Sequence, residues 1–190
     1  GIRVLLFAID LDKLAAMPCS PSIGGMAKGQ LVKEIDALGG EMAKASDKSA
    51  IQYRTLNTKK GPAVHSTRTQ NDKTRYHLSM KMAVESQENL YLKQALVEKL
   101  LFEGNRVAGV EDNTGFCYTA PNVIVATGTF LSGLIHIGEK TIKAGRAGEF
   151  ASYELASQMK EIGFDLGRMK TGTPPRLSRA SIDFSLFTEH

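Results

Sequence analysis

The sequence of 190 residues is 42% hydrophobic and 23% charged, with a formal net charge of +4. These values are typical of a soluble globular domain, and the longest apolar runs are too short to cross a bilayer. Two cysteines and four scattered histidines offer neither a disulfide framework nor a metal-ligand spacing. We therefore expect a cytoplasmic protein with no metal site and no membrane contact.

The first half of the chain is predicted to alternate strands and helices. Residues 2–9 are apolar and β-branched, which predicts a buried parallel strand. A helix with one apolar face is expected over residues 26–38, and Gly39-Gly40 ends it. A strand over residues 51–56 and a helix over residues 67–86 follow.

The second half predicts a β-meander. Strands are expected over residues 90–92, 96–103, 105–111, 115–119, 122–126 and 165–170, and a helix capped by Ser152 over residues 153–162. A meander followed by a buried strand that runs into Thr127 and Gly128 is typical of two-dinucleotide-binding flavoproteins. The expected fold is α/β, a Rossmann-like FAD-binding domain of the glutathione-reductase type with a parallel central sheet. Because no G-x-G-x-x-G motif is present and the chain opens on a strand without Met, we expect an excised piece that lacks the first strand and phosphate loop.

Cys19 is a candidate nucleophile. It lies in a Pro- and Gly-bounded loop just before the first predicted helix, where a helix dipole favours the thiolate. A small buried thiol that only packs is the alternative.

Cationic residues suggest binding of an anion at two places. Residues 54–75 carry six cations, Lys59, Lys60 and Arg68 among them, and are opposed only by Asp72. This segment is either a solvated face or a polyanion-binding surface. If residues 67–86 are helical, Arg68 and Asp72 lie one turn apart and form either a salt bridge or a phosphate or flavin contact. The rigid loop from Lys170 to Arg176 is either an anion site or an ordinary surface turn.

Several long strings resemble one family, and they occur in order along most of the chain. They are Cys19-Ser-Pro-Ser-Ile-Gly-Gly, Lys28-Gly-Gln-Leu-Val-Lys-Glu-Ile-Asp-Ala-Leu-Gly-Gly, Lys60-Gly-Pro-Ala-Val, Gly128-Thr-Phe-Leu-Ser-Gly-Leu-Ile-His-Ile-Gly, Gly145-Arg-Ala-Gly and Lys170-Thr-Gly-Thr-Pro-Pro-Arg. The family is MnmG, also called GidA. The resemblance implies a homodimeric flavoprotein that works with the GTPase MnmE in a two-plus-two heterotetramer. Together they add a carboxymethylaminomethyl or aminomethyl group to C5 of the wobble uridine of certain tRNAs. FAD, NADH and methylene-tetrahydrofolate as carbon donor are also implied.

The same resemblance assigns roles to particular residues. Cys19 matches a cysteine that assists covalently at the uracil ring. Val97 and Ser152 match contacts to FAD, and Thr127 and Gly128 are expected beside the flavin nucleotide. Contacts to cofactor or tRNA phosphate are expected from five cations: Lys59, Lys60, Arg68, Lys170 and Arg176.

The resemblance also divides the chain into a partial FAD-binding domain, residues 1–175, and the start of an inserted nicotinamide or substrate domain, residues 176–190. Without the phosphate loop, the isolated piece is expected to bind FAD weakly and to be inactive. Two alternatives stay open at this point. One is a folate-dependent tRNA uridine methyltransferase flavoprotein, and the other is a non-catalytic dimerisation or interaction module.

Overall fold

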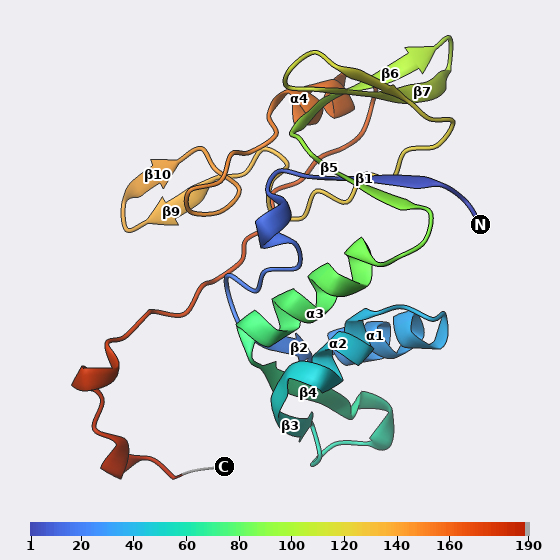
Figure 1. Ribbon diagram of the computed structural model, residues 1–190. Helices are drawn as coiled ribbons and strands as arrows, with labels where there is room; N and C mark the ends of the chain where they lie inside the picture. The colour runs from blue at the N-terminus through green and yellow to red at the C-terminus, as the bar shows by residue number, and fades with distance from the viewer. Residues whose placement is uncertain (189–190) are drawn as a thin grey trace.

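A parallel pair of strands, β1 (Val4–Ala8) and β5 (Leu90–Gln94), runs through the computed structural model, which describes residues 1–188 (Figure 1). The register pairs Val4 with Leu90 and Ala8 with Gln94. The predicted parallel strand is confirmed, but its predicted burial is wrong, because Val4 is 48% exposed and Leu5 39%. Within residues 1–188, β1 pairs with one strand only, so one of its two edges is not hydrogen-bonded to another strand.

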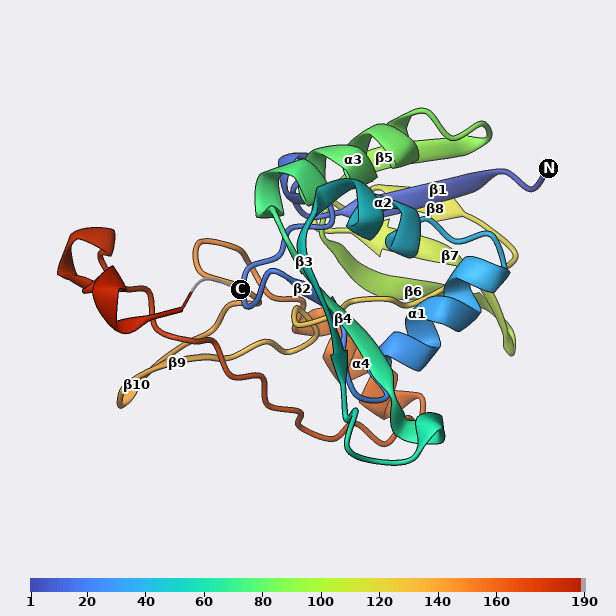
Figure 2. The same ribbon diagram turned by 90° about the horizontal axis from the view of Figure 1, so that it is seen from below.

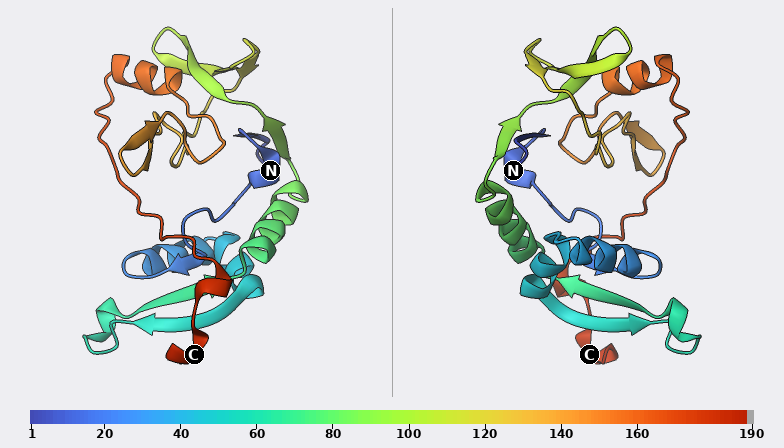
Figure 3. Two further views of the ribbon diagram at one scale, coloured as in Figure 1. Left: turned by 90° about the vertical axis from the view of Figure 1, so that its left-hand side faces the viewer. Right: turned by 90° about the vertical axis from the view of Figure 1, so that its right-hand side faces the viewer.

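A second, antiparallel sheet has the order β2–β4–β3. Its strands are β2 (Ser22–Gly24), β4 (Ser66–Asn71) and β3 (Ala50–Leu56). Helices α1 (Lys28–Ala37) and α2 (Met42–Ser49) lie on one side of this sheet (Figure 3). The predicted end of the first helix is confirmed, since Gly39 has a φ of +87° and the Gly40 amide donates to the Ile35 carbonyl oxygen.

The helix predicted over residues 67–86 is wrong in its first part. Residues 66–71 form β4, and α3 (Lys73–Glu85) begins only after Asp72. Asp72 caps α3 by accepting from the backbone amides of Thr74 and Arg75, at 2.9 and 3.0 Å. Arg68 and Asp72 therefore do not share a helix face. The threonines on either side of Arg68 favour a strand, which outweighs the helical spacing further along. Helix α2 was not predicted.

The predicted β-meander is confirmed. It consists of β6 (Val97–Glu103), β7 (Arg106–Asp112) and β8 (Cys117–Thr119), paired antiparallel in that order. Figure 2 shows β1, β8, β7 and β6 one after another. The Phe7 ring of β1 meets the Tyr118 ring of β8 edge-to-face, with centroids 5.0 Å apart.

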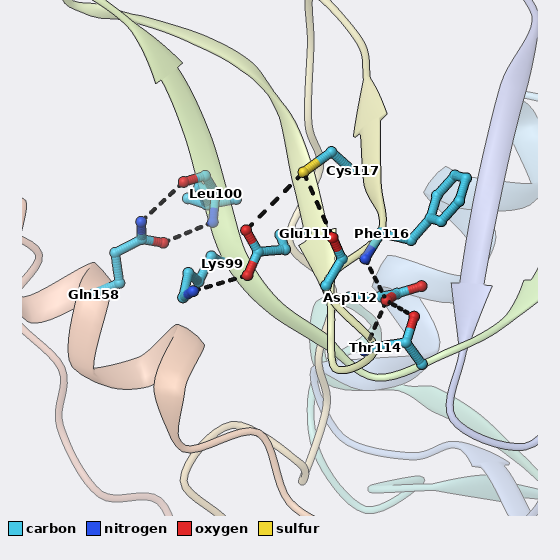
Figure 4. A network of polar contacts seen from close by, with 9 residues as sticks. Lys99, Leu100, Glu111, Asp112, Thr114, Phe116, Cys117 and Gln158 are labelled. Carbon is cyan, nitrogen blue, oxygen red and sulfur yellow. Dashed lines mark hydrogen bonds and ion pairs between the residues drawn. The ribbon is translucent and has the colours of Figure 1, made fainter.

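Helix α4 (Glu154–Glu161) is fastened to the meander through one amide side chain (Figure 4). Gln158 accepts from the Leu100 amide at 2.7 Å and donates to the Leu100 carbonyl oxygen at 2.9 Å. The Gln158 side chain thus hydrogen-bonds to both backbone groups of one residue of β6. These two bonds hold α4 against the meander.

The rest of the chain adds a hairpin of β9 (Ile135–Ile137) and β10 (Lys140–Ile142) and four 3-10 turns, at Leu11–Lys13, Pro62–Val64, Arg179–Ser181 and Phe184–Leu186. The strands predicted over residues 122–126 and 165–170 are wrong, since both stretches are irregular. Ile124 is 91% exposed. Within residues 1–188, neither stretch belongs to a sheet. Residues 189 and 190, the end of the predicted second domain, lie outside the described residues. None of the described helices could cross a membrane.

Candidate nucleotide site

A hollow of about 350 Å³ lies where the two parallel strands end. It is lined by Ile9, Gln94, Ala95, Leu96, Asn113 and Phe150. Ile9 directly follows β1 and Gln94 ends β5, so the hollow is at the carboxyl edge of the parallel pair. Ligands of open α/β sheets bind at this edge.

Asp10, next along the chain, was not among the predicted site residues. Its carboxylate lies 3.0 Å from the Lys13 ammonium and accepts from the Asp12 amide at 2.9 Å. The hydrogen bond from Lys13 and the one from the Asp12 amide lower the pKa of Asp10, and the nearby charge of Arg146 lowers it further. Asp10 is therefore ionised at neutral pH and accepts hydrogen bonds, as binding of a ribose hydroxyl requires. An acid that directly follows an apolar strand is the sequence signal that could have found it.

The structure connects the predicted cofactor residues through hydrogen bonds. The Ser152 hydroxyl donates to the Val97 carbonyl oxygen at 2.9 Å. The Ser152 amide donates to the Phe130 carbonyl oxygen at 2.9 Å, and the Phe130 amide donates to the Thr127 carbonyl oxygen at 3.0 Å. Gly128 lies within this last turn with a φ of +56°. Segments far apart in the sequence are thereby joined into one unit.

Ser152 does not cap α4, contrary to the prediction. Tyr153 holds the cap position and the helix start has no side-chain cap. The Ser152 hydroxyl is used instead on Val97, and the residue is only 3% exposed. The serine thus fixes the start of β6 beside the loop that follows Gly128.

Arg146 brings a cation to the same region. Its guanidinium pairs with Glu149 at 2.8 Å and lies 4.9 Å from the centre of the Phe130 ring. Its Nε is buried and has no hydrogen-bond partner among residues 1–188. A buried donor without a partner is costly. The ionised acceptor at Asp10, the free donor on Arg146 and the strand-end hollow together suit the ribose and anionic parts of a nucleotide.

Cys19 lies in a second group with the predicted anion loop. Its thiol donates to the Gly172 carbonyl oxygen at 2.8 Å, and the Arg176 guanidinium donates to the Pro18 carbonyl oxygen at 2.6 Å. The structure thus brings Cys19 and Arg176 together across most of the chain length. Strand β2 separates Cys19 from α1, so the expected position directly before the helix is wrong. Lys170 is exposed.

The remaining predicted cations lie on the β3–β4 hairpin. Arg68 is on β4, and Lys59 and Lys60 are in the connection between the strands. Among residues 1–188, no group of three or more His, Cys, Asp or Glu side chains could hold a metal ion.

The family model for glucose inhibited division protein A matches residues 1–190. The chain belongs to the GidA family. The resemblance found in the sequence motifs is thereby confirmed. Two relatives carry the name tRNA uridine 5-carboxymethylaminomethyl modification enzyme MnmG. The one from Syntrophobacter fumaroxidans is 63% identical over 189 residues, which are 100% of this chain and 29% of the relative. The one from Desulfitobacterium hafniense is 52% identical over 188 residues, 99% of this chain and 30% of the relative.

Solved structures agree with the GidA assignment. Aquifex aeolicus GidA superposes with a TM-score of 0.89 at 50% identity, over 96% of this chain and 30% of that one. A GidA-related protein from Thermus thermophilus gives a TM-score of 0.60 at 24% identity, over 87% and 60% of the two chains, which shows the fold alone. The predicted Rossmann-like α/β class is confirmed. The chain spans about 30% of the length of these GidA and MnmG relatives.

Asp112 stabilises the meander of this GidA chain (Figure 4). Its carboxylate accepts from the Thr114 hydroxyl and amide at 2.5 and 2.8 Å, from the Phe116 amide at 3.1 Å and from the Tyr118 hydroxyl at 3.1 Å. These hydrogen bonds lower the pKa of Asp112, and the bond from the Thr114 hydroxyl has the largest effect. Desolvation by burial acts in the opposite direction. The ionised form therefore stabilises the turn.

We expect Asp112→Asn to lower the melting temperature at pH 7, because an amide cannot accept all four hydrogen bonds. Since the folded pKa is depressed, this stabilisation is complete above the unfolded carboxyl pKa of about 3.9 and is lost as the pH falls through the folded value. The gap between the melting temperatures of the wild type and the variant should therefore begin to narrow only below about pH 4 and should keep narrowing as the pH falls through the folded pKa, measured by circular dichroism. Asp183→Asn is the control and should shift the melting temperature less, because the Asp183 carboxylate lies at an exposed turn and, among residues 1–188, accepts hydrogen bonds from Ser185 alone. A gap that does not depend on pH would contradict the role given to the carboxylate.

Proposed function

We propose that this chain is the FAD-binding part of a longer enzyme that modifies a tRNA uridine at C5. The observation that carries the proposal is the hydrogen-bonded unit of Val97, Ser152 and Thr127 with Gly128, in a chain of the GidA family. The motif resemblance assigns all four of these residues to FAD. The names of the relatives supply the substrate class, tRNA uridine, and the product, a 5-carboxymethylaminomethyl group.

In this proposal the residues at the strand ends hold the nucleotide. Asp10 accepts hydrogen bonds from ribose hydroxyls, and Arg146 faces the anionic part of the cofactor. Ser152 and the turn at Gly128 position the loops that contact the cofactor. FAD, when bound, supplies redox chemistry that no side chain of the protein can supply.

Cys19 is proposed to act on the uracil ring. Addition of its thiolate to C6 forms a carbon–sulfur bond and places the electron pair of the C5–C6 double bond at C5. C5 then bonds to the methylene carbon of an iminium ion derived from methylene-tetrahydrofolate, and the π electron pair of its carbon–nitrogen double bond moves to the nitrogen. Loss of the C5 proton returns the electron pair, breaks the carbon–sulfur bond and restores the thiolate.

The family resemblance supports the remaining parts of the proposal. NADH is the reductant, MnmE is the partner GTPase in a two-plus-two assembly, and the enzyme is a cytoplasmic homodimer. Residues 1–175 belong to the FAD-binding domain, and residues 176–190 begin an inserted domain. The names of the relatives favour this function over the folate-dependent methyltransferase.

The test uses the full-length protein that carries this chain. Its flavin content is read by absorbance, and its product by mass spectrometry of tRNA nucleosides. Ser152→Ala removes one buried hydrogen bond, worth about 1 kcal/mol, and should weaken FAD binding by roughly fivefold.

Ser157→Ala, at an exposed position in α4, is the matched control and should retain the wild-type FAD affinity. A wild-type protein that holds no flavin and leaves tRNA uridine unmodified would refute the proposed function. Equal flavin affinity in both serine variants would remove Ser152 from the site while leaving the function intact.

A further inference from the structure

Two arginines lie directly opposite each other on the β3–β4 hairpin. The register pairs Arg54 of β3 with Arg68 of β4, between the pairs Tyr53–Thr69 and Thr55–Thr67. Side chains directly opposite on antiparallel strands share a face and lie close together, and like charges in that position repel. The pair therefore destabilises the free sheet unless something lies between the two charges.

Both arginines point away from helix α2. The Thr69 hydroxyl bonds to Ser46 of α2 at 2.8 Å, and the Tyr53 hydroxyl donates to Asp47 of the same helix at 3.0 Å. Thr69 and Tyr53 thus face α2. Because side chains alternate along a strand, their neighbours Arg68 and Arg54 lie on the opposite face of the sheet from α2 (Figure 3).

Neither arginine has an acidic partner in the described part of the chain. No ion pair within residues 1–188 involves Arg54 or Arg68, and the Arg68 Nε is buried without a hydrogen-bond partner. Gln52 and Gln70 form the next pair on the same face and add amide donors. Residues 50–71 contain Arg54, Lys59, Lys60 and Arg68 and no Asp or Glu at all.

We propose that the Arg54–Arg68 pair binds a phosphate group, and specifically a backbone phosphate of the RNA substrate. That the phosphate belongs to an RNA rests on the proposed function. That the pair binds a phosphate at all rests on the hairpin alone. One oxyanion between the two guanidinium groups offsets their repulsion, and it accepts from the unpartnered Arg68 Nε and from the neighbouring amides. Lys59 and Lys60 extend the positive charge to the tip of the hairpin, so a polyanion suits this surface better than a single small ion.

The first test measures binding of tRNA to the full-length protein by fluorescence anisotropy over a range of salt concentrations. Arg54→Gln and Arg68→Gln should each weaken binding and reduce the slope of log K against log salt by about 0.9, as loss of one phosphate contact does. Arg106→Gln is the matched control, because Arg106 is an exposed strand arginine on β7 that forms no ion pair with any other described residue. Slopes unchanged in both hairpin variants would overturn the RNA assignment.

The second test uses inorganic phosphate at constant ionic strength and follows the melting temperature. Phosphate should raise the melting temperature of the wild type more than that of either variant. Without phosphate, Arg54→Gln should melt no lower than the wild type, since it removes repulsion. A variant that melts lower without phosphate, together with equal phosphate effects in all proteins, would overturn the site. If the wild type fails to bind tRNA, the proposed function falls, and the phosphate measurement still decides the site.

Discussion

Cys19→Ser should reduce uridine modification by roughly three orders of magnitude or more, in keeping with the loss of a covalent nucleophile. A serine hydroxyl can donate the same hydrogen bond to the Gly172 carbonyl oxygen that the thiol donates at 2.8 Å. The loop and its contact with residues 170–176 are therefore preserved, and only nucleophilicity is lost. The measurement is mass spectrometry of tRNA nucleosides with the full-length protein.

The flavin content of the Cys19→Ser protein separates this explanation from misfolding. Cys19 belongs to a different group of contacts from Val97 and Ser152, so flavin absorbance should equal that of the wild type. Cys117→Ser is the matched control, because Cys117 is exposed on β8 and should leave modification unchanged. Undiminished modification by Cys19→Ser would end the covalent role. Loss of both flavin and activity would show that the loop has a structural function.

The sequence predicts the meander well because its strands are local. Each strand of residues 97–119 pairs with the next along the chain, and short turns join them. The strand predicted over residues 122–126 fails for the opposite reason. A strand needs a partner, and an apolar run alone does not specify one. At residues 66–71 the β-branched threonines determine the structure, and the helical spacing begins to apply only after Asp72.

The family resemblance names Val97, Thr127, Gly128 and Ser152 as site residues, but the sequence does not predict the contacts among them. Ser152 was expected to cap a helix, whereas its hydroxyl reaches Val97, 55 positions away. The contact between Cys19 and Gly172 spans 153 positions. No local pattern encodes such pairs, because they depend on how separate elements pack. The sequence does contain a signal for each of the two added residues. Asp10 is an acidic residue at the end of an apolar strand, and Arg146 is a cation in a Gly-bounded loop.

The interface between α2 and the β2–β4–β3 sheet is held together by a buried polar cluster. Asn71 is 2% exposed and donates to the Ser46 carbonyl and hydroxyl oxygens at 2.8 and 3.1 Å and to the Ser49 hydroxyl at 3.0 Å. Its own side-chain oxygen accepts from the Thr69 hydroxyl at 2.9 Å. The Asn71 side chain therefore satisfies polar groups on both α2 and the sheet. These groups are buried, so water cannot take the place of the Asn71 side chain.

Asn71→Ala should lower the free energy of unfolding by about 3 kcal/mol, because it breaks several buried hydrogen bonds and leaves their partners unsatisfied. This corresponds to a fall in melting temperature of roughly 10 °C, measured by calorimetry. Asn71→Leu restores the volume without the hydrogen bonds and should be as destabilising as the alanine variant. Asn122→Ala, at an exposed position whose side chain makes no hydrogen bond to the part of the chain that the structure describes, should leave the melting temperature unchanged. A leucine variant as stable as the wild type would show that packing, and not the polar cluster, joins α2 to the sheet that carries Arg54 and Arg68.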